Sequence, residues 1–270
     1  MIFDRRSLLF YFLAVLWSIF QAGCADKLPV SMPIAESQRG DIFAHYQSFR
    51  NNDCTHPIDA DVSLDLNSFG RHLKAAGFLQ LQPPSLLRTT IVDKVGRPLF
   101  ILVTAGDAFT LVNSMKGEVF VGSAASIIRD REHPLDLQPE EVVSLLTGRF
   151  APPVSFIRDV RSDQQSDTTV WLVFSLSGKN SHNILFEPES ERIIRHIIGN
   201  DAGDILLDIN YVWRDEKRGK CSLPDKIMIT GAALDGEVRL KYDLIMLPPV
   251  LPEKTFELNL PEHYIIKRNE

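Results

Sequence analysis

The feature that most constrains the fold of this chain is a long succession of short segments in which apolar and polar residues alternate. Val62, Leu64 and Leu66 alternate with Ser63 and Asp65, and comparable segments recur almost to the C-terminus. A period of two residues is typical of β-strands that bury one face. Turn sequences separate the segments, so we expect short antiparallel strands joined in sequence. The further strands predicted in this way are Phe78–Leu81, Leu86–Val92, Leu99–Val103, Phe109–Val112, Val119–Val121, Val154–Ile157, Val170–Leu176, Ile184–Phe186, Arg192–Ile198, Ile205–Trp213, Ile227–Ile229, Val238–Leu244 and Phe256–Leu260.

Two segments follow the helical period instead. Residues 41–50 place Ile42 and Tyr46 on one face of a helix, and Pro139 and Gly148 mark the start and the end of a second helix. Many sequential strands with few helices indicate a mainly β protein of the α+β class. We expect a single, strongly curved antiparallel sheet whose open side is covered by the helices.

Several of the predicted strands are apolar on both faces. Residues 99–103 and 170–174 contain no polar residue at the alternating positions. Both faces of such a strand must therefore meet something other than water. Two interpretations remain open: a sandwich core, or an apolar concavity of the kind that holds lipid.

The N-terminus has the organisation of a signal peptide over residues 1–23. Arg5 and Arg6 precede an apolar run over Leu8–Phe20, which has the length of a signal-peptide core and is short for a membrane span. Small residues directly before Cys24 resemble the lipobox of bacterial lipoproteins, whose cysteine is acylated. An ordinary secretory signal with a nearby cysteine is the alternative.

Acylation at Cys24 would hold the mature chain on a bacterial membrane through several acyl chains. Residues 24–33 would then be a lipidated tether, and residues 34–270 a single domain. The residue after the cysteine is Ala25 rather than Asp. That pattern resembles export to the outer membrane in enteric bacteria, so we expect a lipid-anchored protein that faces the periplasm.

The two remaining cysteines are Cys54 and Cys221. In an oxidising periplasm they suggest one disulfide between distant parts of the chain. Two separate thiols are the alternative, because the sequence does not show the pairing geometry.

Composition and motifs argue against several classes of function. The formal net charge of −6 argues against nucleic-acid binding, which usually needs a basic excess. The chain has no HExxH pair, nucleophile elbow or P-loop, and its histidines lack metal-ligand spacing. We therefore expect no enzyme activity, no metal and no cofactor.

With the strand order in place, the chain resembles the LolA/LolB family of bacterial lipoprotein-sorting proteins. The residues that support this resemblance are Leu86–Gly96, Leu145–Arg149, Leu223–Ile229 and Glu237–Tyr242. Together they cover most of residues 59–260, in the order and at the spacing of the family.

The resemblance implies an incomplete antiparallel barrel lidded by helices, with an apolar interior that receives acyl chains. It implies that the ligand is an acylated protein or a lipid, delivered by a LolA-like periplasmic carrier. In the family, an apolar residue on a turn between two strands delivers cargo to the bilayer. Val95, in the turn Lys94–Gly96, is the counterpart in this sequence.

We expect the lipid-binding interior to be lined by large apolar side chains of the strands. The candidates are Phe78, Leu81, Phe100, Leu102, Phe109, Trp171, Phe174, Phe186 and Trp213. The alternative function is a docking or assembly lipoprotein of the cell envelope that has the same fold and no lipid cargo.

Overall fold

The computed structural model of the chain describes residues 29, 31–52, 54–68, 70–123, 135, 137–176, 180–200, 202–214 and 222–268. The predicted signal peptide, Cys24 and Cys221 lie outside these residues.

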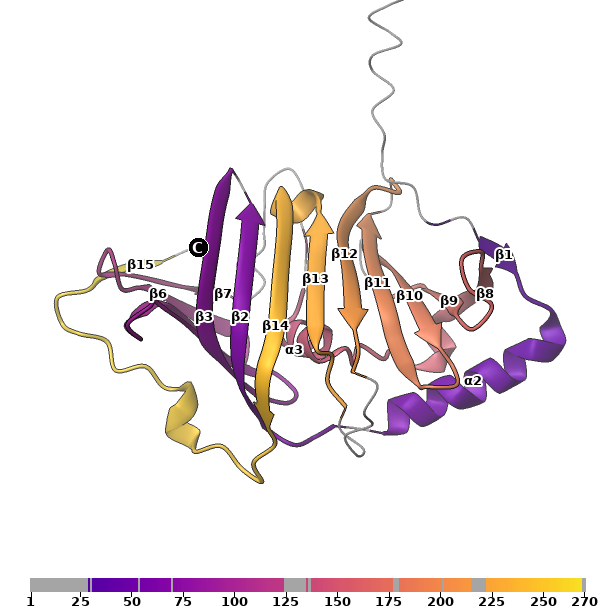
Figure 1. Cartoon of the computed structure of the whole chain (residues 1–270), viewed down its shortest axis with the longest axis horizontal. Coiled ribbons are helices and arrows are strands. Elements are labelled where there is room, and N and C mark those ends of the chain that lie inside the picture. The colour runs from indigo at the N-terminus through magenta and orange to yellow at the C-terminus, as the bar shows by residue number, and fades with distance from the viewer. Residues whose placement is uncertain are drawn as a thin grey trace, which may run out of the picture.

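Fifteen strands of the described chain form one sheet (Figure 1). Their order is β1-β8-β9-β10-β11-β12-β13-β14-β2-β3-β4-β5-β6-β7-β15. Neighbouring strands are antiparallel, except that β15 runs parallel to β7. The bounds are β1 Ser31–Pro33, β2 Ile58–Ser68, β3 Arg71–Gln82, β4 Leu86–Val92, β5 Pro98–Ala105, β6 Ala108–Asn113, β7 Glu118–Ser123, β8 Ile157–Asp163, β9 Val170–Phe174, β10 Asn180–Glu187, β11 Arg192–Asn200, β12 Ile205–Val212, β13 Lys226–Gly231, β14 Gly236–Met246 and β15 Ile265–Arg268.

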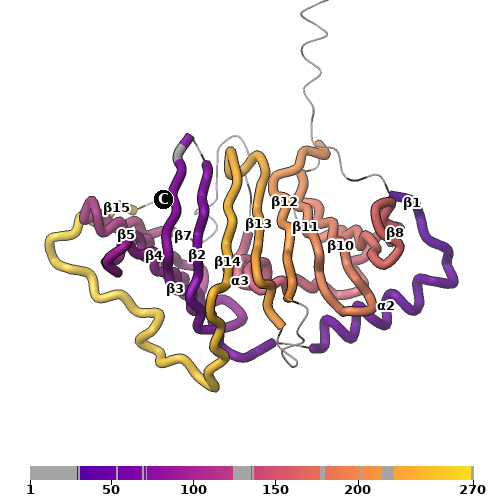
Figure 2. Tube along the Cα trace, viewed as in Figure 1, coloured from indigo at the N-terminus to yellow at the C-terminus, as the bar shows by residue number. Residues whose placement is uncertain are grey.

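The sheet is strongly curved and does not close, because β1 and β15 remain as its two edges (Figures 1 and 2). Helices α2 (Glu36–Asn51) and α3 (Pro139–Thr147) pack against one face of it through Tyr46 and Val143. We call this the inner face and the opposite one the outer face. The expected fold, an incomplete antiparallel barrel with a helical lid, is confirmed.

Both predicted helices form, and α3 begins and ends where its sequence signals lie. The backbone N–H of Gln138 donates to Glu141 Oε2 at 2.9 Å, which satisfies one of the free amides of the first turn. Gly148 ends the helix in the left-handed conformation, with φ of 65°. The hydroxyl of Tyr211 on β12 donates to the carbonyl oxygen of Leu145 at 2.9 Å, which fixes the end of α3 to the sheet.

Two predicted strands are wrong. Val154–Phe156 is a 3-10 helix because Pro153 starts a tight turn, in which the N–H of Phe156 donates to the carbonyl oxygen of Pro153, and β8 follows from Ile157. The predicted strand at 256–260 is the end of a 3-10 helix, Glu253–Phe256, followed by irregular chain. The last strand is instead β15, which pairs with β7.

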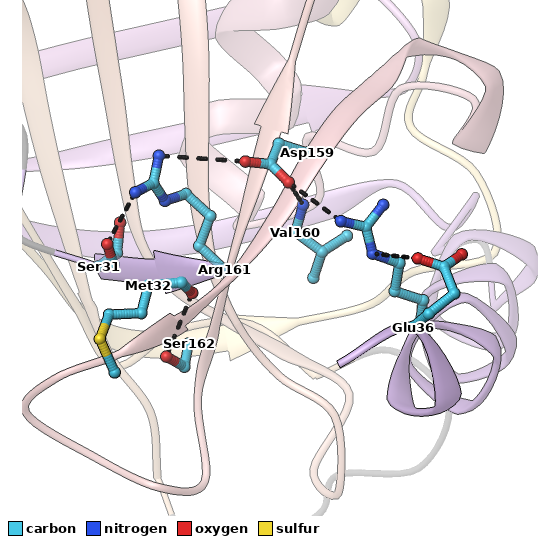
Figure 3. A network of polar contacts seen from close by, with 8 residues as sticks. Ser31, Met32, Glu36, Asp159, Val160, Arg161 and Ser162 are labelled. Carbon is cyan, nitrogen blue, oxygen red and sulfur yellow. Dashed lines mark hydrogen bonds and ion pairs between the residues drawn. The ribbon is translucent and has the colours of Figure 1, made fainter. Parts of the chain in front are cut away.

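Polar contacts hold β1 and the start of α2 on strand β8 (Figure 3). Arg39 of α2 lies between two carboxylates, with Nε 3.3 Å from Glu36 and Nη2 3.4 Å from Asp159. Arg161 donates from Nη2 to the carbonyl oxygen of Ser31 at 2.8 Å. The last three residues of the predicted tether are therefore part of the sheet.

Candidate functional site

The inner face is filled with side chains over strands β8–β14 and β2–β4. Tyr46 of α2 packs between Phe174 and Phe186, with ring centroids 5.8 and 5.6 Å away. Leu81 is fully buried in the same cluster. Trp213 packs against this cluster, and the Nε1 of Trp213 donates to the carbonyl oxygen of Ile193 at 2.7 Å. Four of the nine candidate residues, Leu81, Phe174, Phe186 and Trp213, thus lie in or against the packed core of these strands, and Leu102 of β5 packs at its margin.

The inner face of β5–β7 is different, because four of its five large apolar side chains are only half-buried. Leu102 packs at the margin of the core cluster, and in the described chain it is the one residue of β5–β7 that does so. Leu102 pairs with Leu111, and Leu111 pairs with Phe120, so the three side chains share the inner face. Phe100, two residues before Leu102, faces the same way. All four are half-buried.

We call Phe100, Leu102, Leu111 and Phe120 the inner apolar row. Phe109 lies beside it on the same face and is buried, with 4% of its surface exposed. The sequence prediction included Phe100, Leu102 and Phe109. It omitted Leu111 and Phe120, although both lie in predicted strands at alternating positions.

Two of the candidate residues lie on the outer face. Phe78 alternates with the inner residues Leu79 and Leu81, and 47% of its surface is exposed. Trp171 is buried in a separate cluster with Leu185. The structure therefore does not bring these two side chains together with the inner apolar row.

The chain after β14 packs on the outer face of β4 and β5. Leu251 and Phe256 cover Val103, whose side chain points away from the inner apolar row. Arg88 of β4 donates from Nη1 to the carbonyl oxygens of Thr255 at 2.8 Å and Glu257 at 3.3 Å. The second apolar face of β5, which the sequence left unexplained, is thus covered by the protein's own C-terminal segment.

A groove of about 1010 Å³ lies elsewhere, between α2, the β8–β9 turn and the β10–β11 turn. Its walls are mainly polar and include five acidic side chains and no lysine or arginine. None of the nine candidate residues lines it. The acids are Asp41, Asp163, Asp167, Glu189 and Glu191. A groove of this chemistry does not suit an acyl chain.

Val95 lies at the tip of the β4–β5 turn, with 75% of its surface exposed. Asp93 fixes this turn, because its carboxylate accepts from the backbone N–H groups of Val95 and Arg97, each at 2.9 Å. The same contacts, with the Arg97 side chain, lower the pKa of Asp93. The turn therefore holds Val95 outward.

Two histidines that are far apart in sequence form a buried pair. His182 Nδ1 lies 3.0 Å from His196 Nε2, and the ring of Phe150 stacks on His182. Burial lowers the pKa of His182 to about 4 and that of His196 well below its usual value. Both rings are therefore neutral at physiological pH, and they belong to the packed core.

Cys54 takes part in a disulfide. Its pairing with Cys221 stays a prediction, because Cys221 lies outside the described residues. In the part of the chain that the structure describes, no group of three potential ligand side chains is arranged to hold a metal ion. Within the same residues, no helix has the length and apolar character needed to cross a bilayer.

No protein-family model and no curated protein sequence matches this chain. Solved structures do match it. A DUF1329 family protein from Desulfovibrio piger aligns with a TM-score of 0.55 and 10% identity, over 83% of this chain and 98% of that chain.

Two further solved structures have the same level of similarity. A LolA superfamily protein from Nitrosomonas europaea has a TM-score of 0.55 and 13% identity, over 79% of this chain and 97% of its own. An outer membrane lipoprotein-sorting protein domain from Vibrio parahaemolyticus has a TM-score of 0.55 and 10% identity, over 79% and 95%. The chain therefore has the LolA-like fold that its sequence resemblance predicted.

Proposed function

We propose that this protein is a lipid-anchored envelope protein that binds acyl chains on the inner face of β5–β7. It receives either lipoproteins, delivered by a LolA-like periplasmic carrier, or lipids. It passes this cargo to the outer membrane. The observation that supports this most directly is the inner apolar row. Half-buried leucine and phenylalanine side chains on a concave sheet offer apolar surface that a ligand can cover.

Transfer of this kind needs no catalytic group and no nucleotide. An acyl chain gains about 25 cal/mol for each Å² of apolar surface removed from water. Cargo therefore leaves the carrier when the inner apolar row offers it a lower free energy, and leaves the row when the bilayer offers a lower one still. Val95, held outward by Asp93, is the proposed point of delivery.

Anchoring rests on acylation of Cys24. The first strand begins at Ser31, so the proposed tether between lipid and sheet is short. Mass spectrometry of the mature protein tests this part alone: a diacylated N-terminal cysteine is expected, and an unmodified N-terminus contradicts it.

The inner apolar row is tested by titrating the purified protein with a fluorescent fatty acid. Leu111→Asp places a charge on the inner face, and we expect it to weaken binding at least tenfold, because the acyl chain must then cover a carboxylate. Thr110→Asp is the matched control: Thr110 is the neighbouring residue on the opposite face and pairs with Val103. Equal binding by the two variants contradicts the proposed site.

A docking or assembly lipoprotein without lipid cargo is the second candidate. The packed core under β8–β14 favours it, because side chains already fill most of the inner face. No fatty-acid uptake by the parent protein, together with an acylated N-terminus, supports this function over acyl-chain transfer.

A further inference from the structure

We propose that one end of the sheet docks on an anionic phospholipid bilayer through three exposed apolar side chains, Val95, Met115 and Ile265. This goes beyond Val95 as a single delivery residue. It deepens the proposed transfer of cargo and rests on it for its biological purpose, but docking is measurable separately.

The strand directions bring the three residues to the same end. Strands β4 and β6 are both antiparallel to β5, so the β4–β5 turn with Val95 and the β6–β7 turn with Met115 leave the sheet on one side. The N–H of Ser114 donates to the carbonyl oxygen of Leu99 at 3.0 Å, so the two turns lie next to each other.

Strand β15 adds the third residue. It runs parallel to β7, and the N–H of Ile265 donates to the carbonyl oxygen of Gly117, in the β6–β7 turn, at 2.8 Å. The exposed fractions are 75% for Val95, 66% for Met115 and 62% for Ile265. Strands are spaced by about 4.8 Å, so the three side chains span roughly 20 Å from β4 to β15.

The charge around these side chains fits an anionic surface. Residues 93–97, 114–118 and 263–267 contain four cations and two acids, a net charge of +2, whereas the whole chain has −6. Of the acids, Asp93 is engaged by Val95 and Arg97, and Glu118 by Lys267. Lys94 and Lys116 are exposed and make no salt bridge in the described part of the chain. Exposed apolar side chains beside exposed lysines are typical of proteins that bind the surface of an anionic bilayer.

Co-sedimentation with vesicles tests the proposal. The protein is the chain from Ala25 onward, which retains every described strand and helix and has no acyl anchor. We expect it to bind phosphatidylcholine vesicles that contain phosphatidylglycerol, and not vesicles of phosphatidylcholine alone. Lys94→Gln and Lys116→Gln each lower the partition coefficient about fivefold, and Met115→Asp and Ile265→Asp lower it about tenfold.

Val250→Asp is the matched control. Val250 is 68% exposed but follows the C-terminal end of β14, which pairs with the start of β2 and so lies at the opposite end of the sheet. Vesicle binding unchanged by Met115→Asp and Ile265→Asp overturns the proposal, as does an equal loss in Val250→Asp. Circular dichroism and melting curves show that each variant is folded.

Fatty-acid binding by the same variants separates this proposal from the proposed function. Vesicle binding without fatty-acid binding contradicts acyl-chain transfer and supports docking. Fatty-acid binding without vesicle binding contradicts docking and leaves the inner apolar row in place.

Discussion

The hydroxyl of Tyr242, on strand β14, donates a hydrogen bond of 2.7 Å to the carbonyl oxygen of Leu146, near the C-terminal end of helix α3. Tyr242 is fully buried, and burial raises the pKa of its hydroxyl. Together with the bond from Tyr211 to Leu145, this contact fixes the end of the lid helix to two strands of the sheet.

Tyr242→Phe removes this hydrogen bond and leaves a carbonyl oxygen of α3 without a partner. We expect the free energy of unfolding to fall by about 1–2 kcal/mol, measured by urea denaturation. Tyr264→Phe is the control, because its hydroxyl has no hydrogen bond in the described chain. Equal stability of the two variants would show that the contact contributes nothing.

Stability should depend on pH through the histidine pair. The pKa of His182 is about 4 in the folded protein and is near 6.5 in an unfolded chain. Because the pKa of His182 is lowered in the folded protein, its neutral ring contributes to the free energy of unfolding above pH 6.5. This contribution is lost as the pH falls towards 4. We expect a loss of about 3 kcal/mol at pH 4 from His182, with a further loss from His196.

The measurement is the urea midpoint as a function of pH. His182→Gln keeps a hydrogen-bonding partner for His196 and removes one titrating group. The pH dependence should therefore become shallower in this variant, and an unchanged slope would rule out His182 as its source.

Gly148→Ala should destabilise the end of α3 for two reasons. The left-handed φ of 65° costs a non-glycine residue about 1–2 kcal/mol. In addition, the new Cβ would lie 2.9 Å from Cζ2 of Trp213. Gly70→Ala is the control: its φ is 67°, and nothing lies within 4 Å of the added Cβ. A larger loss of stability and a shift of tryptophan fluorescence are expected in Gly148→Ala alone.

Phe256→Ala should loosen the C-terminal segment from the outer face of β5. Phe256 is largely buried against Val103 and Leu251, so we expect a loss of about 3 kcal/mol in the free energy of unfolding. Limited proteolysis should then cut within residues 247–264 sooner. Val250→Ala, at an exposed position of the same segment, should change neither measurement.

The fold could be predicted from the sequence because most strands alternate and are bounded by turn residues. The edge strands could not. Residues 31–33 and 265–268 are too short to show a period, and they are strands because β8 and β7 offer them a free edge. The acidic groove could not be predicted either, because it depends on where α2 packs on the sheet, and no local sequence pattern predicts that position.

The faces of the apolar strands were harder to predict than the strands themselves. Phe78 and Leu81 are three residues apart, as are Trp171 and Phe174, and positions three apart in a regular strand point to opposite sides. Where both faces are apolar, the sequence does not indicate which one meets the helices. The histidine pair could not be predicted either, because it forms only through the pairing of β10 with β11, which brings together two residues that are fourteen apart in the sequence.

The two unpaired edges of the sheet have a mechanical consequence. A closed barrel has a circumference set by its number of strands and their stagger, so its bore is rigid. This sheet ends at β1 on one side and β15 on the other, and a small change of twist at each strand pair alters its radius while every ladder of hydrogen bonds stays intact. The curvature of this sheet can therefore change without the loss of any backbone hydrogen bond between its strands, which a closed barrel does not allow.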